Sequence, residues 1–346
     1  MHNNQSYLCN VISYIPNIPS ISKAQNNYHH IAFTGTSNYI SWIGVTMSSI
    51  MEKHKEHNFC FHILVDKLED GDQKSLQVFS EKWQIPVYIY FINDSNLKQY
   101  ARFDRYIANG TYSTVFLYRF LVPFISKCHG QKILYMDGDI VCNGSFSELY
   151  NIDMGDFIIA GVEDLKGHEY AKSLLIDKYF NAGVLLINTK AWNKQGLTEK
   201  FLCKMKEESE KNKQLGCADQ DVLNMVLHSH VMFIDRKYNS PYRLVQPSIF
   251  KNKIINNDPM QASLIHFIGA IKPWTTYNQS VPIVKVWAAA KDDSPWADKP
   301  LHRPQSQKAL HQAARDWRRQ RKWLHMLRAY GQFWQSKLNG TPKNGY

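Results

Sequence analysis

Short runs of apolar residues alternate with segments of helical periodicity along much of this chain. The runs HIAFT, FCFHILV, PVYIYFI and KILYM are separated by stretches in which apolar side chains recur every three or four residues. Strands joined by helical crossovers pair in parallel within one sheet. The alternation therefore predicts an α/β fold with a mostly parallel sheet. The predicted strands are residues 30–34, 59–65, 86–92 and 132–136, and the predicted helices are residues 42–51, 68–83 and 114–125.

The remaining residues extend this pattern and then depart from it. Further strands are expected at residues 157–162, 183–188 and 264–267, and further helices at residues 190–212 and 220–230. We expect an irregular lead-in over residues 1–27, a proline-bearing linker over residues 291–305 and helical structure over residues 307–338. With 346 residues, 44% of them hydrophobic, the chain can bury a substantial core.

The sharpest local feature is the sequence KILYMDGDIVC, in which Asp137, Gly138 and Asp139 follow an apolar strand. Ligands of open α/β sheets bind at the carboxyl ends of strands. Two carboxylates separated by one residue can both coordinate one cation, and oxygen ligands suit Mg²⁺ or Mn²⁺. The alternative is a solvated turn between two strands, because Asp and Gly are common turn residues.

Three later segments strengthen the first interpretation. They read FNAGVLLIN at residues 180–188, ADQDVLN at residues 218–224 and IHFIGAIKPW at residues 265–274. In this order after YMDGD they resemble glycosyltransferase family 8, and within it the bacterial lipopolysaccharide core α-glucosyl- and α-galactosyltransferases. Residues 33–50, 116–120 and 294–301 resemble the same family. The resemblance implies a GT-A-type (Rossmann-like) mixed, mostly parallel sheet flanked by helices, with a basic helical tail at the C-terminus.

The resemblance also implies a domain organisation and a reaction. An irregular lead-in (residues 1–27) would precede a GT-A catalytic domain (residues 28–278) and a basic, Trp-rich helical region (residues 279–346) for membrane association. The activity would be retaining, metal-dependent transfer of glucose or galactose from a UDP-hexose to the outer core of lipopolysaccharide in an α linkage.

A cation site follows from the same resemblance. The family's metal ligands fall on Asp137, Asp139 and His266, which would hold Mn²⁺ or Mg²⁺. A single His in an apolar strand is more often a core residue, but here it accompanies two carboxylates and Lys272 in one pattern. Nitrogen and oxygen ligands together suit Mn²⁺.

Further positions match residues that bind the donor or act in catalysis. The resemblance implies a catalytic group of Gln220, Asp219 and Asp164, with Glu163 as the alternative to Asp164. The donor-binding group is Thr36, Asn38, Tyr39, Arg119, Asp137, Gly138, Asn181, Ala182, Gly269 and Lys272. Thr36 stands where the family usually has an Asp that helps to bind uracil. The competing interpretations are solvated surface cations for Arg119 and Lys272, and helix capping for Asp219 or Asp221.

The matched residues favour one mechanism. A covalent route with retention would need a carboxylate beneath the anomeric carbon. The family position nearest that carbon holds the amide of Gln220, which is a poor nucleophile. We therefore expect same-face displacement through an oxocarbenium-like state, in which the cation, Lys272 and Arg119 neutralise the departing diphosphate.

The positive charge of the chain is concentrated near its C-terminus. Residues 279–346 carry 13 Lys or Arg, 4 Asp or Glu and five of the nine Trp, whereas the net charge of the whole chain is +11. A helix with Trp and Leu on one side and Arg on the other can lie in a membrane interface, and polybasic segments are attracted to anionic lipid. A helix packed on the catalytic domain, with its arginines solvated, is the alternative.

These features predict the location and exclude some functions. Six scattered Cys indicate a reducing compartment, and no signal peptide or spanning segment is expected. We expect a cytoplasmic protein, peripheral on the inner membrane of a Gram-negative-type bacterium.

A nucleic-acid binder would explain the basic tail but none of the motifs, so no nucleic-acid partner is expected. An inactive sugar-nucleotide-binding or scaffold relative remains the other alternative, because Thr36 replaces the usual Asp.

Overall fold

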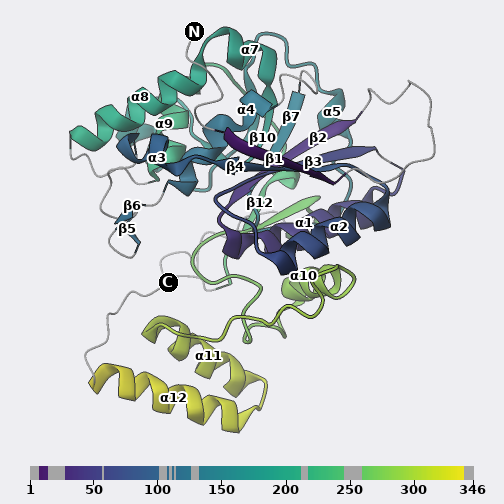
Figure 1. Ribbon diagram of the computed structural model, residues 1–346. Helices are drawn as coiled ribbons and strands as arrows, with labels where there is room; N and C mark the ends of the chain where they lie inside the picture. Colours follow the sequence, from purple (N-terminus) through teal and green to yellow (C-terminus); the bar gives the residue numbers. More distant parts are fainter. Residues whose placement is uncertain are drawn as a thin grey trace.

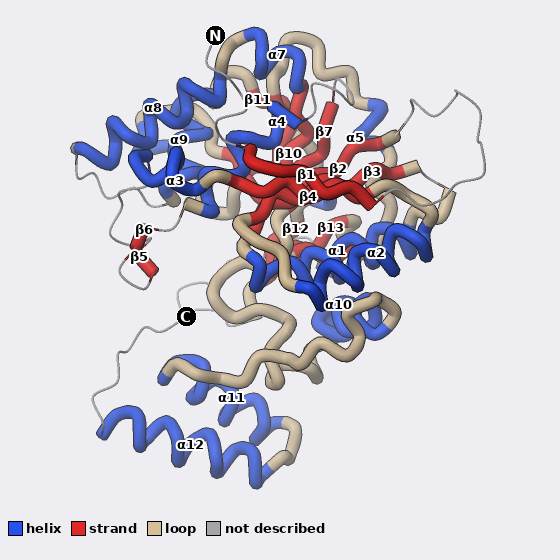
Figure 2. Tube along the Cα trace, viewed as in Figure 1, coloured by secondary structure: helices blue, strands red, loops and turns tan. Residues whose placement is uncertain are grey.

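A computed structural model describes residues 8–14, 28–56, 58–100, 107–108, 111–112, 114–125, 132–211, 217–244 and 259–338. At its centre is an eight-stranded sheet (Figures 1 and 2). Its strands, in spatial order, are β1 (Leu8–Tyr14), β4 (Val87–Ile92), β3 (Phe59–Val65), β2 (His29–Gly35), β7 (Lys132–Met136), β10 (Phe180–Asn188), β9 (Ile159–Glu163) and β11 (Val231–Phe233).

The pairing within this sheet is mixed. Strands β4, β3, β2 and β7 run parallel to one another, and β11 runs parallel to β9. Strand β10 is antiparallel to both β7 and β9. This confirms the expected mixed, mostly parallel α/β sheet.

Strand β1 corrects the expectation of an irregular lead-in over residues 1–27. It pairs antiparallel with β4, from Tyr14 opposite Val87 to Leu8 opposite Ile92. The lead-in therefore contributes an edge strand, which gives the outer side of β4 a hydrogen-bonding partner.

Helices cover both faces of the sheet. On one face α1 (Ile40–Lys53) and α2 (Asp70–Trp83) pack their apolar sides on the strands. On the other face lie a 3-10 helix, η5 (Val115–Leu121), and α7 (Thr189–Lys194), α8 (Leu197–Glu210) and α9 (Ala218–Leu227). The shorter helices are η2 (Ser37–Tyr39), α3 (Asp94–Leu97), η3 (Lys98–Tyr100), α4 (Val122–Ile125), α5 (Glu148–Asn151), α6 (Gly167–Leu174), η7 (Arg236–Tyr238) and η9 (Pro259–Gln261).

Two helices expected from the sequence differ in the structure. Residues 114–125 form mainly the 3-10 helix η5, with one α-helical turn after it. The helix expected over residues 190–212 is divided at Gly196, whose φ of +61° is left-handed and separates α7 from α8.

A small second sheet brings distant segments together. Its order is β12 (Ser240–Tyr242), β13 (Leu264–Phe267) and β8 (Ile140–Cys142), and a two-stranded sheet of β5 (Ile107–Ala108) and β6 (Thr111–Tyr112) lies apart from it. Strand β8 begins directly after the Asp-Gly-Asp sequence, and His266 of β13 is paired with Ile140. This pairing places β13, which carries His266, beside the two aspartates.

The C-terminal region has two parts. Helix α10 (Pro282–Asp292) packs Trp287 against Trp42 of α1, so it is part of the same hydrophobic packing as α1 and the small sheet. The segment 291–305, expected to be a linker, is packed as well, because Trp296 is buried and donates a hydrogen bond to Asp72.

Helices α11 (Gln307–Arg319) and α12 (Trp323–Leu338) form an antiparallel hairpin at the edge of the molecule (Figure 1). None of the described helices is long and apolar enough to cross a bilayer.

Candidate active site

Asp137, Asp139 and His266 converge at the carboxyl end of β7. Nε2 of His266 lies 3.2 Å from Oδ1 of Asp139 and 3.8 Å from Oδ2 of Asp137. The backbone supports this arrangement, because the Asp137 amide donates to the Gly183 carbonyl and the Phe267 amide donates to the Asp139 carbonyl. The three residues predicted as metal ligands can therefore share one ion.

A chain of side-chain amides determines the tautomer of His266. The carboxylate of Asp164 can only accept, so Nδ2 of Asn181 donates to it at 2.8 Å. Oδ1 of Asn181 then accepts from Nδ2 of Asn239 at 2.8 Å, which turns Oδ1 of Asn239 toward Nδ1 of His266 at 2.9 Å. In the neutral imidazole, Nδ1 therefore carries the proton. Nε2 of this tautomer presents its lone pair to the two carboxylates, as in metal-binding histidines.

The donor set fits a divalent cation. Oδ1 of Asp139 is buried and accepts no hydrogen bond from any described residue. A carboxylate oxygen and an imidazole lone pair 3.2 Å apart repel each other unless a proton or a metal ion lies between them. A buried, unsatisfied acceptor is costly, so these atoms are suited to a hard or borderline cation.

Lys272 lies beside the same carboxylate. Its ammonium donates to Oδ2 of Asp139 and to the carbonyl of Phe267. Burial opposes ionisation of Asp139, but the ammonium of Lys272 holds the pKa of this carboxyl below its usual range. Between β13 and Lys272, Gly269 has a φ of +90°, a conformation that glycine adopts readily. Only 15% of the Lys272 side chain is exposed, so Lys272 is a partner of the candidate metal site and not a solvated surface cation.

Arg119 joins two acidic residues of the site. Its Nη2 lies 3.3 Å from Oδ1 of Asp137, and its Nε lies 3.0 Å from Oδ2 of Asp219. Only 15% of its side chain is exposed, and the guanidinium lies over the ring of Tyr135. The structure thus excludes the interpretation of Arg119 as a solvated helix arginine.

The predicted catalytic amide lies in a second network next to the metal ligands. Oε1 of Gln220 accepts from the Ala182 amide at 2.9 Å. Its Nε2 lies 3.3 Å from Oδ2 of Asp164 and 3.2 Å from the hydroxyl of Tyr179. The network brings together Gln220, Asp164, Asn181 and Ala182, all of which were predicted from the sequence.

Asp219 and Asp221 have different roles in the structure. Asp221 accepts from the Cys217 amide at the start of α9 and from the Tyr179 hydroxyl, so it stabilises the helix locally. Asp219 instead pairs with Arg119. Burial raises the pKa of the Asp219 carboxyl against the opposing effect of Arg119. The capping interpretation therefore applies to Asp221.

The loop after β2 borders the metal site through Tyr39. Its ring packs edge-on against Trp274 and next to Gly138, where an added Cβ would lie only 2.7 Å from Ile43. Thr36 is partly buried and Asn38 is exposed in the same loop, and the Thr36 carbonyl accepts from the Tyr39 amide. The predicted donor-binding loop is therefore adjacent to the aspartates.

Comparison with known proteins identifies the family. The model of glycosyl transferase family 8 matches residues 30–278. The chain belongs to glycosyl transferase family 8. It is 29% identical over 326 residues to the lipopolysaccharide glucosyltransferase WaaO of Escherichia coli K12, with 92% of each chain covered. It is 27% identical over 317 residues to the lipopolysaccharide 1,3-galactosyltransferase of Salmonella typhimurium, with 89% of this chain and 91% of that chain covered.

Solved structures establish the fold of this family 8 glycosyltransferase as GT-A. The galactosyltransferase LgtC, in complex with donor and acceptor sugar analogues, aligns with a TM-score of 0.62 at 21% identity. The alignment covers 77% of this chain and 96% of that chain. The glycosyltransferase GlyE of Streptococcus pneumoniae aligns with a TM-score of 0.59 at 20% identity, over 78% of this chain and 62% of that chain.

The sequence did not predict several residues of the glycosyltransferase site. Asn239 orients His266, Tyr135 donates to Asp137 at 2.6 Å, and Tyr179 contacts Gln220. Asn239 lies in the unremarkable sequence YNSPY, which contains no spacing that would identify it. The alternation of β7 does place Tyr135 and Asp137 on one side of the chain, which was the available signal for Tyr135.

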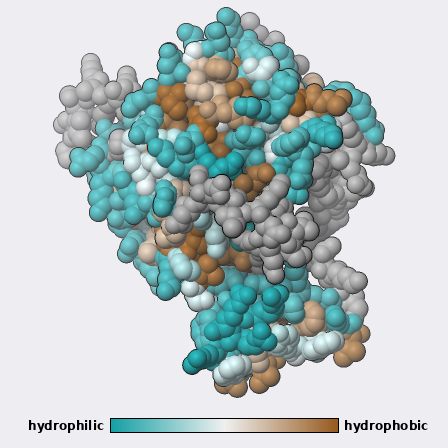
Figure 3. All heavy atoms as spheres, turned by 180° about the vertical axis from the view of Figure 1, so that it is seen from behind, coloured by the Kyte–Doolittle hydropathy of each residue, from teal (hydrophilic) through white to brown (hydrophobic). Residues whose placement is uncertain are grey.

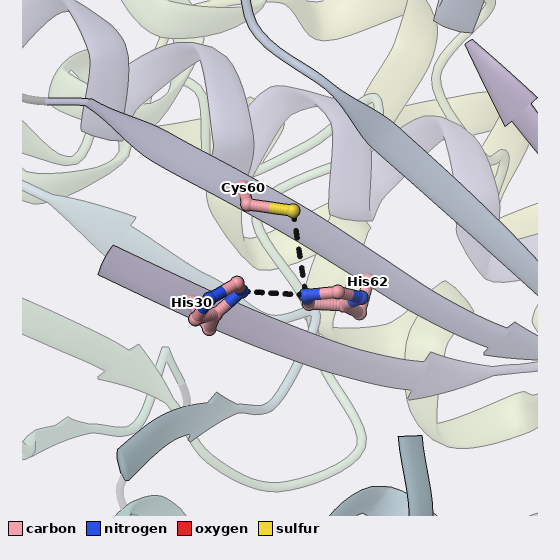
Figure 4. Close-up of side chains that lie close together, drawn as sticks. All are labelled: His30, Cys60 and His62. Atoms are coloured by element: carbon pink, nitrogen blue, oxygen red, sulfur yellow. Dashed lines mark hydrogen bonds between the residues drawn. The ribbon is translucent and has the colours of Figure 1, made fainter. Parts of the chain in front are cut away.

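A second group of possible metal ligands lies elsewhere in the glycosyltransferase. His30, Cys60 and His62 converge from β2 and β3 (Figure 4), with His30 Nδ1 3.0 Å and Cys60 Sγ 3.4 Å from Nε2 of His62. His62 also contacts the Tyr90 hydroxyl at 3.1 Å. Burial raises the pKa of the Cys60 thiol to about 12, which favours a protonated, hydrogen-bonded group. His30 and Cys60 lie near the starts of their strands, whereas Asp137 follows the end of β7, so this cluster is separate from the candidate active site.

Proposed function

We propose that this glycosyltransferase transfers glucose or galactose from a UDP-hexose, with retention and in an α linkage, to the outer core of lipopolysaccharide. The observation that carries the proposal is the placement of Nε2 of His266 against the carboxylates of Asp137 and Asp139. The relatives that act on lipopolysaccharide support the acceptor class. The catalytic domain would be residues 28–278.

The ligand set would be Asp137, Asp139 and His266, holding Mn²⁺ or Mg²⁺. A bound divalent cation supplies positive charge to the diphosphate oxygens of the donor. Lys272 and Arg119 would add fixed positive charge on either side of that position, because each is already held next to a ligand carboxylate. Such preorganised charge favours departure of the diphosphate.

The sugar would lie over the network of Gln220. The amide would stabilise positive charge at the anomeric carbon through its oxygen, and Asn181 and Asp164 would bind sugar hydroxyls. Asp219, held by Arg119, would bind a further hydroxyl. Because Gln220 is a weak nucleophile, the acceptor hydroxyl would attack from the face that the diphosphate leaves, and the diphosphate would take its proton.

Replacement of Asp139 by Ala tests the proposal. We expect transfer from UDP-glucose and UDP-galactose to truncated core acceptors to be abolished at every Mn²⁺ concentration, while circular dichroism shows a folded protein. Asp156→Ala, at an exposed aspartate, is the matched control and should retain activity. Full activity of Asp139→Ala, or of the unmodified enzyme in EDTA, would refute the metal assignment.

We further propose that the C-terminal region docks the enzyme on the cytoplasmic face of the inner membrane. Large apolar side chains on α12 are exposed, including Leu324 (72%), Leu327 (61%) and Trp334 (58%). In Figure 3 hydrophobic atoms gather along the lower edge of the molecule, where Figure 1 places this helix. Exposed apolar groups beside many cations are suited to an anionic lipid surface.

Sedimentation with anionic phospholipid vesicles at low salt tests this docking. Because burial of a Leu side chain contributes about 1.5–3 kcal/mol, Leu324→Gln with Leu327→Gln should weaken vesicle binding at least about tenfold. Leu175→Gln removes a leucine that is 93% exposed but lies on the catalytic body, and should leave binding unchanged. Equal effects of the two changes would contradict membrane docking through α12.

A further inference from the structure

A pocket of about 480 Å³ lies between the α11–α12 hairpin and the chain that leads into it. Trp317 of α11 and Lys322 of the turn line it together with His325 and Arg328 of α12. Thr276 and Arg303, which precede the hairpin in the sequence, also line the pocket. The pocket is thus formed by residues that lie up to 56 positions apart in the sequence, from Thr276 to Gln332.

The charge of the pocket has one sign. Arg303, Lys322 and Arg328 line it, and no Asp or Glu does so. Within the described residues, no carboxylate lies at ion-pair distance from any of these three cations. Asp316, the acidic residue of α11, instead accepts from the Asn278 amide at 2.7 Å and from Gln320. Clustered cations without a counter-charge attract an anion.

The remaining lining groups indicate what kind of anion fits. Oγ1 of Thr276 is buried and has no hydrogen-bond partner among the described residues. Trp317 adds an apolar wall, and Gln332 adds an amide. The volume falls in the range of pockets that bind small organic ligands, so it exceeds the need of a bare phosphate ion. An arginine guanidinium group can donate two parallel hydrogen bonds to the oxygens of one phosphate group.

We propose that this pocket binds a phosphorylated sugar of the acceptor glycan. The inference rests on the proposed function, because it assigns a second contact to the same acceptor. Arg303, Lys322 and Arg328 bind the phosphate group, and Thr276, Gln332 and Trp317 contact the sugar that carries it.

The position of the pocket connects it to the donor site. Thr276 lies four residues after Lys272, and its amide donates to the His302 carbonyl at 2.9 Å. The following residues attach the hairpin, since Tyr277 packs edge-on against Trp317 and the Asn278 amide binds Asp316. A phosphate held here is therefore fixed relative to the loop that carries Lys272.

The pocket also lies beside the apolar surface of α12. His325, Arg328 and Gln332 form one stripe of this helix, and Leu324, Leu327 and Trp334 form the neighbouring stripe. Successive residues of a helix differ by about 100° around its axis, so the two stripes are adjacent. A lipid-anchored, phosphorylated glycan would reach the pocket at the level of the membrane surface.

The test uses the full-length enzyme and a core oligosaccharide released from its lipid, either phosphorylated or treated with phosphatase. The pocket variant Lys322→Gln with Arg328→Gln is compared with Arg315→Gln plus Arg319→Gln, which removes the same charge from exposed positions of α11. We expect the pocket variant to raise the KM for the phosphorylated acceptor at least tenfold. The KM for the dephosphorylated acceptor and for the donor should not change, and the control variant should resemble the unmodified enzyme.

Two results would overturn the assignment. One is an unchanged KM for the phosphorylated acceptor, and the other is an equal rise of the KM for both acceptors. An unchanged KM together with a loss of binding to anionic vesicles would identify the pocket as a lipid headgroup site. If the unmodified enzyme transfers sugar to neither acceptor, the proposed function fails. Calorimetric binding of the phosphorylated oligosaccharide, lost in the pocket variant only, would still support the pocket.

Discussion

Replacement of Asn239 by Ala should weaken metal activation without changing the three ligands. Asn239 is 2% exposed, and its Oδ1 accepts the Nδ1 proton of His266 at 2.9 Å. Without this acceptor, the imidazole can take the other tautomer or rotate, and Nε2 no longer presents its lone pair to the aspartates. Loss of such an outer partner typically costs 10–100-fold in metal affinity, or about 1.4–2.7 kcal/mol.

The assay is the Mn²⁺ dependence of UDP-hexose hydrolysis and of transfer. We expect the Mn²⁺ concentration for half-maximal rate to rise about 10–100-fold, with much of the rate recovered at saturating metal. Asn239→Asp retains an acceptor oxygen and should be affected less. Asn193→Ala removes another side-chain amide that makes one hydrogen bond, to the Pro123 carbonyl, and controls for loss of stability. An unchanged Mn²⁺ requirement in Asn239→Ala would refute the role assigned to this residue.

Two glycine substitutions test the packing around the site. In Gly183→Ala the new Cβ would lie 2.3 Å from Cε1 of His266, so the imidazole must move. We expect Mn²⁺-stimulated activity to fall at least about tenfold, while the circular dichroism spectrum stays that of a folded protein. In Gly44→Ala the new Cβ would lie 2.3–2.5 Å from three ring atoms of Trp296, so the melting temperature should fall, with a destabilisation of about 1–3 kcal/mol. Gly71→Ala is the control, because Gly71 lies in α2 and no atom is within 4 Å of the new Cβ. This variant should keep its activity and be as stable as the unmodified enzyme or more stable. If Gly71→Ala loses as much stability or activity as the two test variants, the steric explanation is wrong.

The buried strands could be predicted from the sequence almost to the residue. Residues 59–65, 132–136 and 264–267 match β3, β7 and β13, because strands covered on both faces are apolar throughout. The motif residues could also be predicted, since the family pattern assigns Asp137 and His266 together, and the antiparallel pairing of β8 with β13 brings them into contact.

The parts that could not be predicted depend on partners far away in the chain. Strand β1 lies in a segment of Asn, Ser and Pro and owes its conformation to β4, more than 70 residues later. The amide relay through Asn239 joins residues that share no local motif. Residues 291–305 have the composition of a linker, yet Trp296 is buried because Gly44 leaves space for its ring.

The contact between Trp296 and α1 has a consequence for biosynthesis. The indole nitrogen of Trp296 donates to Asp72, 224 residues earlier, and its ring fills the space beside Gly44. During synthesis from the N-terminus, the apolar surface of α1 and α2 that Trp296 covers must therefore stay exposed until most of the protein has been made. Such long-range closure is slow and leaves apolar surface exposed in the meantime. The last third of the polypeptide thus completes a hydrophobic layer whose other components are synthesised first.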